Sequence, residues 1–340
     1  MLRLVSLTLL LSFGLASQDR PGFEPVRLIL DTDIGNDIDD TLALALIHAL
    51  ENRAEVRLLA VTITKDNRYC APFVDLVNTY YGRPDIPIGV VRNGKTPEDS
   101  PMIELPAKRR DAAGHYVYPH RIESGAQAPD AVELLQRVLA EQPDHSVTIA
   151  QIGFSTNLAR LLQTSGGRDL IQRKVKVLCL MAGNFRKPKP EYNVYTDPAS
   201  AKIVFEQWPT AMIFSGFEIG QAVVFPYESI QDDFQYAANH PVAEAYRIFL
   251  PKHEDRPAWD PTAVLEAIRP SRKYFDLSPA GRVSLGPKNT TTFSADPQGN
   301  CRYLIVNPDQ AVRVRELLTA LVSEPPQRGH GSTVEHRMAF

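Results

Sequence analysis

Short apolar runs alternate with stretches of helical periodicity between residues 26 and 215. The apolar runs predict strands at Val26–Leu30, Val56–Thr64, Ile86–Val90, Val147–Gln151, Val175–Met181 and Ala211–Ser215. The stretches between them predict helices at Asp39–Glu51, Ala71–Tyr81, Ala131–Glu141, Thr156–Gln163 and Pro198–Gln207. This rhythm is typical of βαβ units, and uninterrupted apolar strands indicate that both sheet faces are covered. We therefore predict an α/β fold with a mainly parallel open sheet and helices on both faces.

The remaining segments complete a single predicted domain over residues 24–323. Residues 92–128 show no clear period and predict a long loop, and Pro308–Val322 predicts a closing helix. Three short runs predict antiparallel strands at Arg282–Leu285, Thr290–Ser294 and Arg302–Val306. The chain shows no internal repeat and no linker. Residues 324–340 are polar, contain Pro325-Pro326, and predict a disordered tail.

Residues 1–16 have the pattern of a secretory signal peptide. Arg3 precedes an apolar stretch, and small residues at Gly14 and Ala16 fit a cleavage site after Ala16. A buried first helix is the alternative, but Arg20-Pro21-Gly22 follows at once and would end it. We therefore expect an exported protein that is periplasmic or secreted.

The charge balance and the cysteines narrow the classes of partner. The chain has 37 Lys and Arg residues against 40 Asp and Glu residues, for a net charge of -3, which argues against a nucleic-acid partner. After residue 16 no apolar run reaches the roughly 18 residues that span a bilayer, which argues against a membrane partner. Cys70, Cys179 and Cys301 fit neither a disulfide scaffold nor a zinc site, and Cys179 lies in a predicted buried strand.

A dense carboxylate cluster follows the first predicted strand. Five aspartates occur within ten residues, at Asp31, Asp33, Asp37, Asp39 and Asp40. In a parallel sheet, ligands bind beyond the carboxyl ends of the strands, which is where this cluster lies. Carboxylates without nearby His or Cys favour Ca²⁺ or Mg²⁺ over zinc. An EF-hand does not fit, since its glycine and glutamate positions hold Asn36 and Leu42. An Asp-nucleophile phosphatase and a solvated acidic loop remain open alternatives.

The cluster also resembles a family signature. Asp31-Thr32-Asp33-Ile34-Gly35 with Asp39-Asp40-Thr41 resembles the N-terminal motif of the inosine–uridine-preferring nucleoside hydrolases, with two extra residues that make Asp37 an additional carboxylate. Four later segments resemble further family motifs in the same order, and they run Ala60-Val61-Thr62-Ile63-Thr64-Lys65-Asp66-Asn67, Ile152-Gly153-Phe154-Ser155-Thr156-Asn157-Leu158-Ala159, Glu191-Tyr192-Asn193-Val194-Tyr195-Thr196-Asp197-Pro198 and Trp259-Asp260-Pro261. The matches cover about 240 residues.

The resemblance implies a site and a reaction. The reaction is Ca²⁺-dependent hydrolysis of a ribonucleoside to base and ribose, through an oxocarbenium-like transition state, on a Rossmann-like core. The family pattern assigns Asp33 as the general base. It assigns the metal ligands to Asp33, Asp40, the Ile152 carbonyl and Asp260. It assigns substrate contacts to Asp39, Asn67, Asn184, Glu191, Asn193 and Trp259. It further implies a small-molecule ribosyl substrate and a homo-oligomer, either dimer or tetramer.

Each assignment has a simpler structural alternative. Asn67 and Asn193 are typical turn residues. Asp260 before Pro261 fits a helix N-cap, and Glu191 follows two lysines with which it would pair on a surface loop. The residue before Asp260 is often histidine in the family, where it protonates the leaving base, whereas here it is Trp259. Trp stacks on a base but cannot protonate it. Phe185 stands where the family has an asparagine, for which Asn184 would compensate.

Two further functions stay open beside nucleoside hydrolysis. One is a hydrolase of the same fold that acts on another ribosyl or glycosyl compound. The other is a non-enzymatic exported protein that binds sugars or nucleosides, for which two similar lobes and a hinge would be expected. The predicted loop at residues 92–127 would form a lid, and it holds candidate leaving-group acids at His115, Tyr116, Tyr118 and His120, with His253 as another candidate.

Overall fold

The computed structural model describes residues 24–327. The predicted signal peptide and residues 328–340 of the predicted tail lie outside the described residues. Residues 324–327 are described, and they contact the end of the first helix: Glu324 forms an ion pair with Arg53, and Gln327 Nε2 donates to the Asn52 carbonyl at 3.1 Å.

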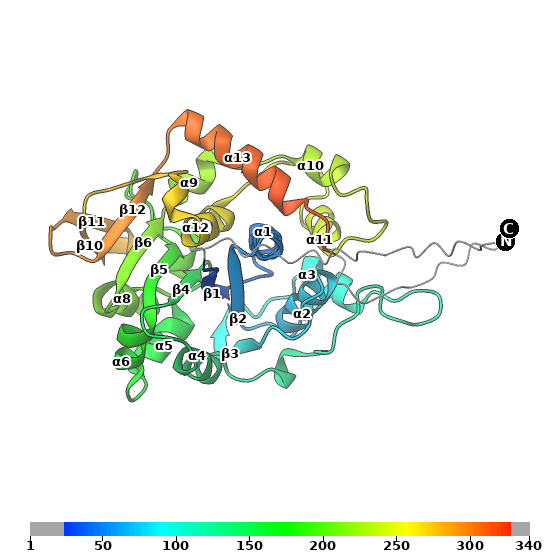
Figure 1. Cartoon of the computed structure of the whole chain (residues 1–340), viewed down its shortest axis with the longest axis horizontal. Helices are drawn as coiled ribbons and strands as arrows, with labels where there is room; N and C mark the ends of the chain where they lie inside the picture. The colour runs from blue at the N-terminus through cyan, green and yellow to red at the C-terminus, as the bar shows by residue number, and fades with distance from the viewer. Residues whose placement is uncertain (1–23, 328–340) are drawn as a thin grey trace, which may run out of the picture.

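One large sheet runs through the domain (Figure 1). Its strands are β1 Val26–Thr32, β2 Val56–Lys65, β3 Ile88–Lys95, β4 Val147–Gln151, β5 Val175–Met181, β6 Ala211–Ser215, β9 Asp276–Leu277, β10 Gly281–Leu285, β11 Thr291–Ala295 and β12 Cys301–Ile305. Its order is β11-β10-β12-β6-β5-β4-β1-β2-β3, with β9 paired to β12. Two more strands, β7 Val224–Phe225 and β8 Arg256–Pro257, form a separate pair. The pairs from β3 across to β12 are all parallel, so the predicted mainly parallel open sheet is confirmed.

Helices cover both faces of this sheet, as predicted (Figure 1). On one face, the sheet packs against α1 Asp39–Asn52, α2 Cys70–Tyr80 and α12 Trp259–Ile268. A further layer of helices packs against these, and it consists of α3 Pro101–Lys108, α11 Pro241–Phe249 and α13 Pro308–Val322. The other face packs against α4 Ala131–Ala140, α5 Thr156–Gln163, α6 Gly167–Lys174 and α8 Pro198–Gln207. Three short helices complete the set: α7 Tyr192–Thr196, α9 Phe217–Ala222 and α10 Tyr227–Asp232. The sheet therefore separates two apolar cores.

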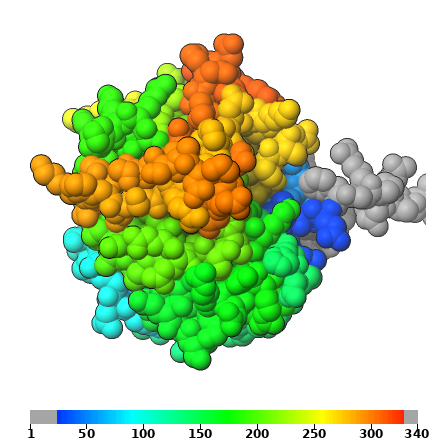
Figure 2. Space-filling view, turned by 90° about the vertical axis from the view of Figure 1, so that its left-hand side faces the viewer, coloured from blue at the N-terminus to red at the C-terminus, as the bar shows by residue number. Residues whose placement is uncertain are grey.

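The C-terminal strands depart from the sequence prediction. β10 and β11 form the expected antiparallel hairpin, and Figure 2 shows these orange residues as a band across one end of the molecule. β12, however, pairs in parallel with β6 through Cys301↔Met212 and its two neighbours, and meets β10 at one position only. β12 is antiparallel to β10 and to β9, as predicted, but its parallel pairing with β6 was not predicted, because a short apolar run carries no information about the strand beside which it packs.

The long segment predicted as a loop also holds structure. Residues 92–95 extend β3, Pro101 begins helix α3, and a 3₁₀ turn spans Gly125–Gln127. Pro at the first helical position is compatible with a helix, but Pro106 and the polar flanks hide the helical period in the sequence.

The three cysteines are buried and free, and Cys179 lies in β5 as predicted. Within residues 24–327, no helix combines the length and the apolar character needed to cross a membrane.

The order of the strands in the sheet creates a crevice next to β1. From β1 the sheet extends through β2 and β3 on one side and through β4, β5 and β6 on the other, so β1 and β4 mark the point where the strand order reverses. Such a switch point opens a crevice at the carboxyl ends of the strands. The chain leaving β4 passes close to that leaving β1, and a Cβ on Gly153 would lie 2.5 Å from the Asp33 backbone nitrogen. Glycine is therefore required there.

Candidate active site

A cavity of about 340 Å³ lies at the carboxyl ends of β1 and β4. It is lined by Asp33, Asn36, Asp37, Asp39, Asp40, Ile152, Met181, Glu191, Tyr192, Asn193, Phe217, Arg256, Trp259 and Asp260. Eight of the ten residues predicted for the site from the sequence are in this lining. The two that are not are Asn67 and Asn184.

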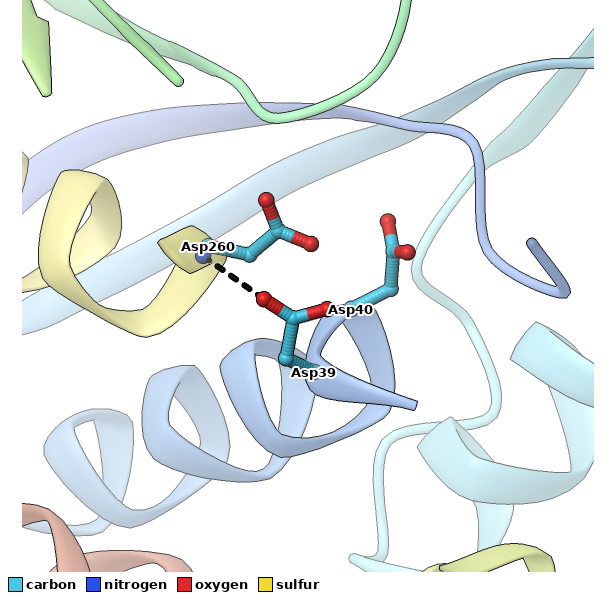
Figure 3. A group of neighbouring side chains, drawn as sticks. All are labelled: Asp39, Asp40 and Asp260. Carbon is cyan, nitrogen blue, oxygen red and sulfur yellow. Dashed lines mark hydrogen bonds between the residues drawn. The ribbon is translucent and has the colours of Figure 1, made fainter. Parts of the chain in front are cut away.

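Three carboxylates converge on one side of the cavity, where the first turns of α1 and α12 meet (Figure 3). Oxygens of Asp39, Asp40 and Asp260 all lie within 4.8 Å of one another, and the three residues are buried. The Asp260 backbone N–H donates to Asp39 Oδ2 at 3.0 Å. Asp260 lies inside the first turn of α12, after Ala258 at the N-cap, so it does not cap that helix. Its carboxylate is therefore free to face Asp39 and Asp40.

Burial dominates the electrostatics of these groups. Desolvation, followed by repulsion from neighbouring carboxylates, raises the pKa values of Asp39, Asp40 and Asp260 well above the ordinary aspartate value. Desolvation also raises the pKa of Asp33 to about 6. At neutral pH, buried carboxylates at this density need protons or a cation. All three converging groups offer hard oxygen ligands, so the donor set fits Ca²⁺ or Mg²⁺.

The remaining two predicted metal ligands line the same cavity. Asp33 Oδ2 accepts a hydrogen bond from Asn36 Nδ2 at 2.8 Å. The Ile152 carbonyl follows β4 and accepts from Asn193 Nδ2 at 2.8 Å. The converging trio thus contains Asp39, which the resemblance assigned to the sugar, in place of Asp33. Adjacent positions on the first turn of α1 bring both Asp39 and Asp40 next to Asp260.

Glu191 and Asn193 enter the cavity from the start of α7. Glu191 caps that helix: its carboxylate accepts from the backbone nitrogens of Asn193 at 2.8 Å and Val194 at 3.3 Å. Desolvation nevertheless raises the pKa of Glu191 to about 7. The Asn193 amide donates to the carbonyls of Ile152 and Met181, and so links the ends of β4 and β5. The predicted pairing of Glu191 with surface lysines does not occur, since Glu191 is buried.

Asn67 and Asn184 serve the neighbouring loops. The Asn67 amide donates to the carbonyls of Pro97 and Glu98, and its oxygen accepts from the Tyr69 backbone. Asn184 Oδ1 accepts from the Lys187 backbone nitrogen at 2.9 Å. The structure therefore does not bring these two into the cavity, because their side chains satisfy turn hydrogen bonds first, as Asn commonly does.

Aromatic residues form another part of the cavity lining. Trp259 Nε1 donates to the Phe217 carbonyl at 2.9 Å, and the two rings stack with centroids 5.5 Å apart. A Cβ on Gly220 would lie 2.2 Å from the Trp259 ring, so α9 must carry glycine there for the indole to fit. Tyr192 adds a third aromatic residue to the lining. The cavity lining thus contains a group of carboxylates and an aromatic wall, the latter formed by Trp259, Phe217 and Tyr192.

The sequence profile described as "Inosine-uridine preferring nucleoside hydrolase" matches residues 28–321. The chain belongs to this family. The inosine-uridine preferring nucleoside hydrolase of Leishmania major is 26% identical over 305 residues, which cover 82% of this chain and 91% of that protein. The pyrimidine-specific ribonucleoside hydrolase RihA of Shewanella sp. strain MR-4 is 29% identical over 265 residues, or 68% of this chain and 72% of that one. Among solved structures, an inosine-guanosine nucleoside hydrolase matches with a TM-score of 0.67 and 18% identity, over 87% of this chain and 97% of that one.

Family membership establishes the class of activity. A nucleoside hydrolase is an N-ribosyl hydrolase, a glycosidase that acts on N-glycosyl compounds, and it serves nucleoside salvage. The predicted fold and enzyme class are therefore confirmed.

The histidines and tyrosines named above as leaving-group acids lie elsewhere in this nucleoside hydrolase. His115 is exposed beside Asp111, and Tyr118 is buried with its hydroxyl donating to Glu244 Oε2 at 2.6 Å. The rings of His120 and Tyr116 contact each other at a tilt of 48°, and His253 stacks on Tyr227. No histidine of residues 24–327 lines the cavity. No residue of the segment at 92–127 lines the cavity, but Thr96 Oγ1 accepts a hydrogen bond from the lining residue Asn36 at 3.2 Å.

Four lining residues with polar or aromatic groups were missed by the sequence analysis: Asn36, Tyr192, Phe217 and Arg256. The additional carboxylate Asp37 binds Arg256 in the structure. Nothing in the local sequence indicated which of the chain's lysines and arginines would bind Asp37, because Arg256 is 219 positions away.

Proposed function

We propose that this nucleoside hydrolase is an exported, Ca²⁺-dependent enzyme that hydrolyses ribonucleosides to free base and ribose. The observation that carries the proposal is the buried group Asp39, Asp40 and Asp260, which lines the crevice at β1 and β4 together with the aromatic wall. A group of acidic oxygens suits the cation and the vicinal hydroxyls of a ribose, and a stacked indole suits a flat base.

Asp40, Asp260, the Ile152 carbonyl and Asp33 are the ligands that we propose for the cation, with Asp39 beside them. A bound Ca²⁺ supplies an activated, oriented water and an anchor for the sugar hydroxyls. Asp33 accepts the proton of the attacking water as the general base, since its carboxylate lines the cavity beside the other proposed ligands. Its hydrogen bond from Asn36 orients the carboxylate.

The ribose is held by groups that also favour the transition state. Asp39, Glu191 and Asn193 lie in the lining where they can accept or donate to sugar hydroxyls. Their carboxylates place negative charge beside a ring that becomes positive as the C–N bond breaks. Asn67 and Asn184 hold the loops at residues 97–98 and 187, so we propose that their contribution to binding runs through loop position. Trp259 stacks on the base.

A panel of nucleosides tests this function. Inosine, uridine, adenosine and cytidine are incubated with the full-length mature protein, and chromatography measures free base and ribose. We expect release of base that stops with a chelator and returns with added Ca²⁺. Glu266→Gln is a matched control on α12: desolvation raises the pKa of Glu266 to about 8, so its neutral replacement leaves activity intact. Release of phosphate from phosphoesters without release of base would favour the phosphatase alternative.

Export and assembly need separate experiments. We propose that cleavage after Ala16 leaves a mature N-terminus near Ser17, in the periplasm or outside the cell. N-terminal sequencing of the exported protein tests this, and recovery of exported chains that begin at Met1 contradicts it. We also propose a homo-oligomer, dimer or tetramer, and light scattering of the purified protein measures its mass.

A further inference from the structure

Arg256 is the single lysine or arginine among the described residues that line the cavity, and six carboxyl groups line the same cavity. Its Nε donates to Asp37 Oδ1 at 2.9 Å, and its Nη2 donates to Asp37 Oδ2. The Arg256 and Asp37 side chains are 27% and 25% exposed, so the pair faces the open cavity. A fork of two parallel bonds fixes the plane of a guanidinium. Asp37, the carboxylate that the family pattern does not explain, thus orients Arg256.

The guanidinium lies at the aromatic wall. Its carbon is 5.1 Å from the centre of the Trp259 ring and 5.4 Å from that of Phe249. Within residues 24–327 no hydrogen-bond acceptor contacts Arg256 Nη1, whereas Nε and Nη2 are both used. Arg256 Nη1 can therefore donate a hydrogen bond to a ligand beside the Trp259 ring, on which a base would stack.

The base that leaves beside Trp259 must have its electron pair stabilised. When the ribosyl C1′–N bond breaks, its electron pair stays on the base nitrogen, which must be protonated or carry negative charge. Trp259 replaces the histidine that protonates the base in the family pattern, and the histidines at 115, 120 and 253 lie outside the cavity. A cation that cannot lose its proton still stabilises an anion.

We propose that Arg256 is the specificity-determining residue for the leaving base: oriented by Asp37, it stabilises a base that departs as an anion. The inference rests on the proposed nucleoside hydrolysis and adds the residue that contacts the leaving base. It favours bases whose anions are delocalised over carbonyl oxygens. Cationic N-ribosylpyridinium compounds, whose leaving group is neutral and whose ground state the guanidinium repels, are disfavoured.

The step balances without another reactant. The water oxygen bonds to C1′ as the C1′–N pair moves to the base, and the proton of the water passes to Asp33. The base anion leaves against Arg256, and the proton then returns from Asp33 to the base through solvent. The products are ribose and neutral base, and Asp33 is again a carboxylate.

A series of ribosides tests the proposal. The substrates are 4-nitrophenyl riboside, uridine, inosine and nicotinamide riboside, and kcat and KM are measured for the mature wild-type protein, Arg256→Met, Arg256→Lys and Asp37→Asn. We expect Arg256→Met to lower kcat/KM by about 10²-fold for inosine and uridine, the cost of one preorganised donor, but by less than tenfold for the activated 4-nitrophenyl riboside. Nicotinamide riboside loses nothing or gains. Arg256→Lys retains part of the effect, and Asp37→Asn lowers kcat with the same preference.

Arg269→Met is the matched control. Arg269 makes the same kind of fork with Glu55, at 2.8 Å from Nε and 2.5 Å from Nη2, but neither residue lines the cavity. We expect it to lower thermal stability without altering the order of substrates. Equal losses for all four ribosides in Arg256→Met would make Arg256 a structural clamp and overturn the proposal.

A binding experiment separates this inference from the proposed function. If wild-type protein released no base from any nucleoside, the proposed function would fail. Calorimetry would then compare a urate anion with neutral adenine as probes. Preferential binding of urate that Arg256→Met removes supports the anion site, and equal binding of both probes by wild type overturns it.

Discussion

The two ends of helix α1 bury ionisable groups with opposite consequences. At its first turn, Asp39 and Asp40 face Asp260, and desolvation raises their pKa values. Near its last turn, His48 is fully buried: its Nε2 lies 2.9 Å from Asn78 Oδ1 and its ring stacks on Tyr81 at 4.8 Å. Desolvation lowers the pKa of His48 to about 3.

The difference lies in what each group needs at neutral pH. An imidazole releases its proton and becomes neutral, so burial of His48 is tolerated without a counter-ion. A carboxylate must gain a proton or a cation to reach the same state. The C-terminal end of α1 therefore buries His48, which is neutral without a partner. The N-terminal end buries Asp39 and Asp40, which need protons or a cation.

The largest effect that separates the two ends is on turnover. Asp40→Asn and Asp260→Asn each remove a charged oxygen ligand, and we expect kcat/KM to fall about 10³-fold or more, as loss of several kcal/mol of transition-state stabilisation requires. His48→Gln leaves kcat/KM within a few-fold of wild type. Steady-state kinetics with saturating Ca²⁺ make the comparison, and normal Ca²⁺ binding and turnover in both aspartate variants would show that the assigned ligands are wrong.

The next effect is on stability with and without Ca²⁺. Folded-state pKa values raised above the unfolded values mean that the carboxylates of the cavity favour folding when protonated, so the metal-free protein loses stability as pH rises from about 4 through about 6. Ca²⁺ replaces those protons. We expect its stabilisation, about 2.7 kcal/mol at a hundredfold excess over Kd, to be larger at pH 8 than at pH 5. Unfolding in CaCl₂ and in chelator measures it, and an equal gain at both pH values would refute the linkage.

His48, at the other end of α1, gives a smaller pH effect on stability, and its contribution is lost as pH falls and not as pH rises. The folded pKa of His48 lies below the unfolded value of about 6.5, so its contribution is complete above pH 6.5 and is lost as pH falls toward 3. We expect His48→Gln to reduce the slope of the unfolding free energy below pH 6 by about 1.4 kcal/mol per pH unit. Urea unfolding at pH 7, 6 and 5 measures this. His115→Gln, with an 80% exposed side chain, is the control that keeps the wild-type slope.

The smallest effect isolates the partner of His48. Asn78→Ala removes the hydrogen bond to Nε2, and we expect a loss of about 1 kcal/mol in the free energy of unfolding with unchanged kcat/KM. Denaturant unfolding and a uridine assay on the same preparation measure both. A change in turnover would mean that the two ends of α1 are coupled, which contradicts the separation drawn between them.

Local sequence patterns predicted many of the helices and strands. β4, α5, β5, α8, β6 and α13 have the predicted bounds. Their signals are local: apolar runs mark the strands, Asp197 caps α8, and Asn307 forms a capping box with Gln310 at the start of α13. The family motifs likewise placed eight residues in one cavity, because parallel strands bring their carboxyl ends to one edge of the sheet.

Other features depend on which distant segments pack together. The sequence pattern did not indicate that β12 pairs in parallel with β6 or that Asp39 joins Asp40 and Asp260. It also did not indicate that the Asn67 side chain bonds to the loop at residues 97–98. Each is set by a contact between segments far apart in the chain.

Residue types and their order along the chain determined the elements, the sheet and the acidic character of the site, because backbone periodicity and capping are local properties. Packing of α9, α12 and β8 against the start of α1 decided the aromatic wall and joined Arg256 to Asp37 across 219 positions. The physical reason is that charge pairing and stacking in a crevice depend on distance in space, which only the folded chain defines.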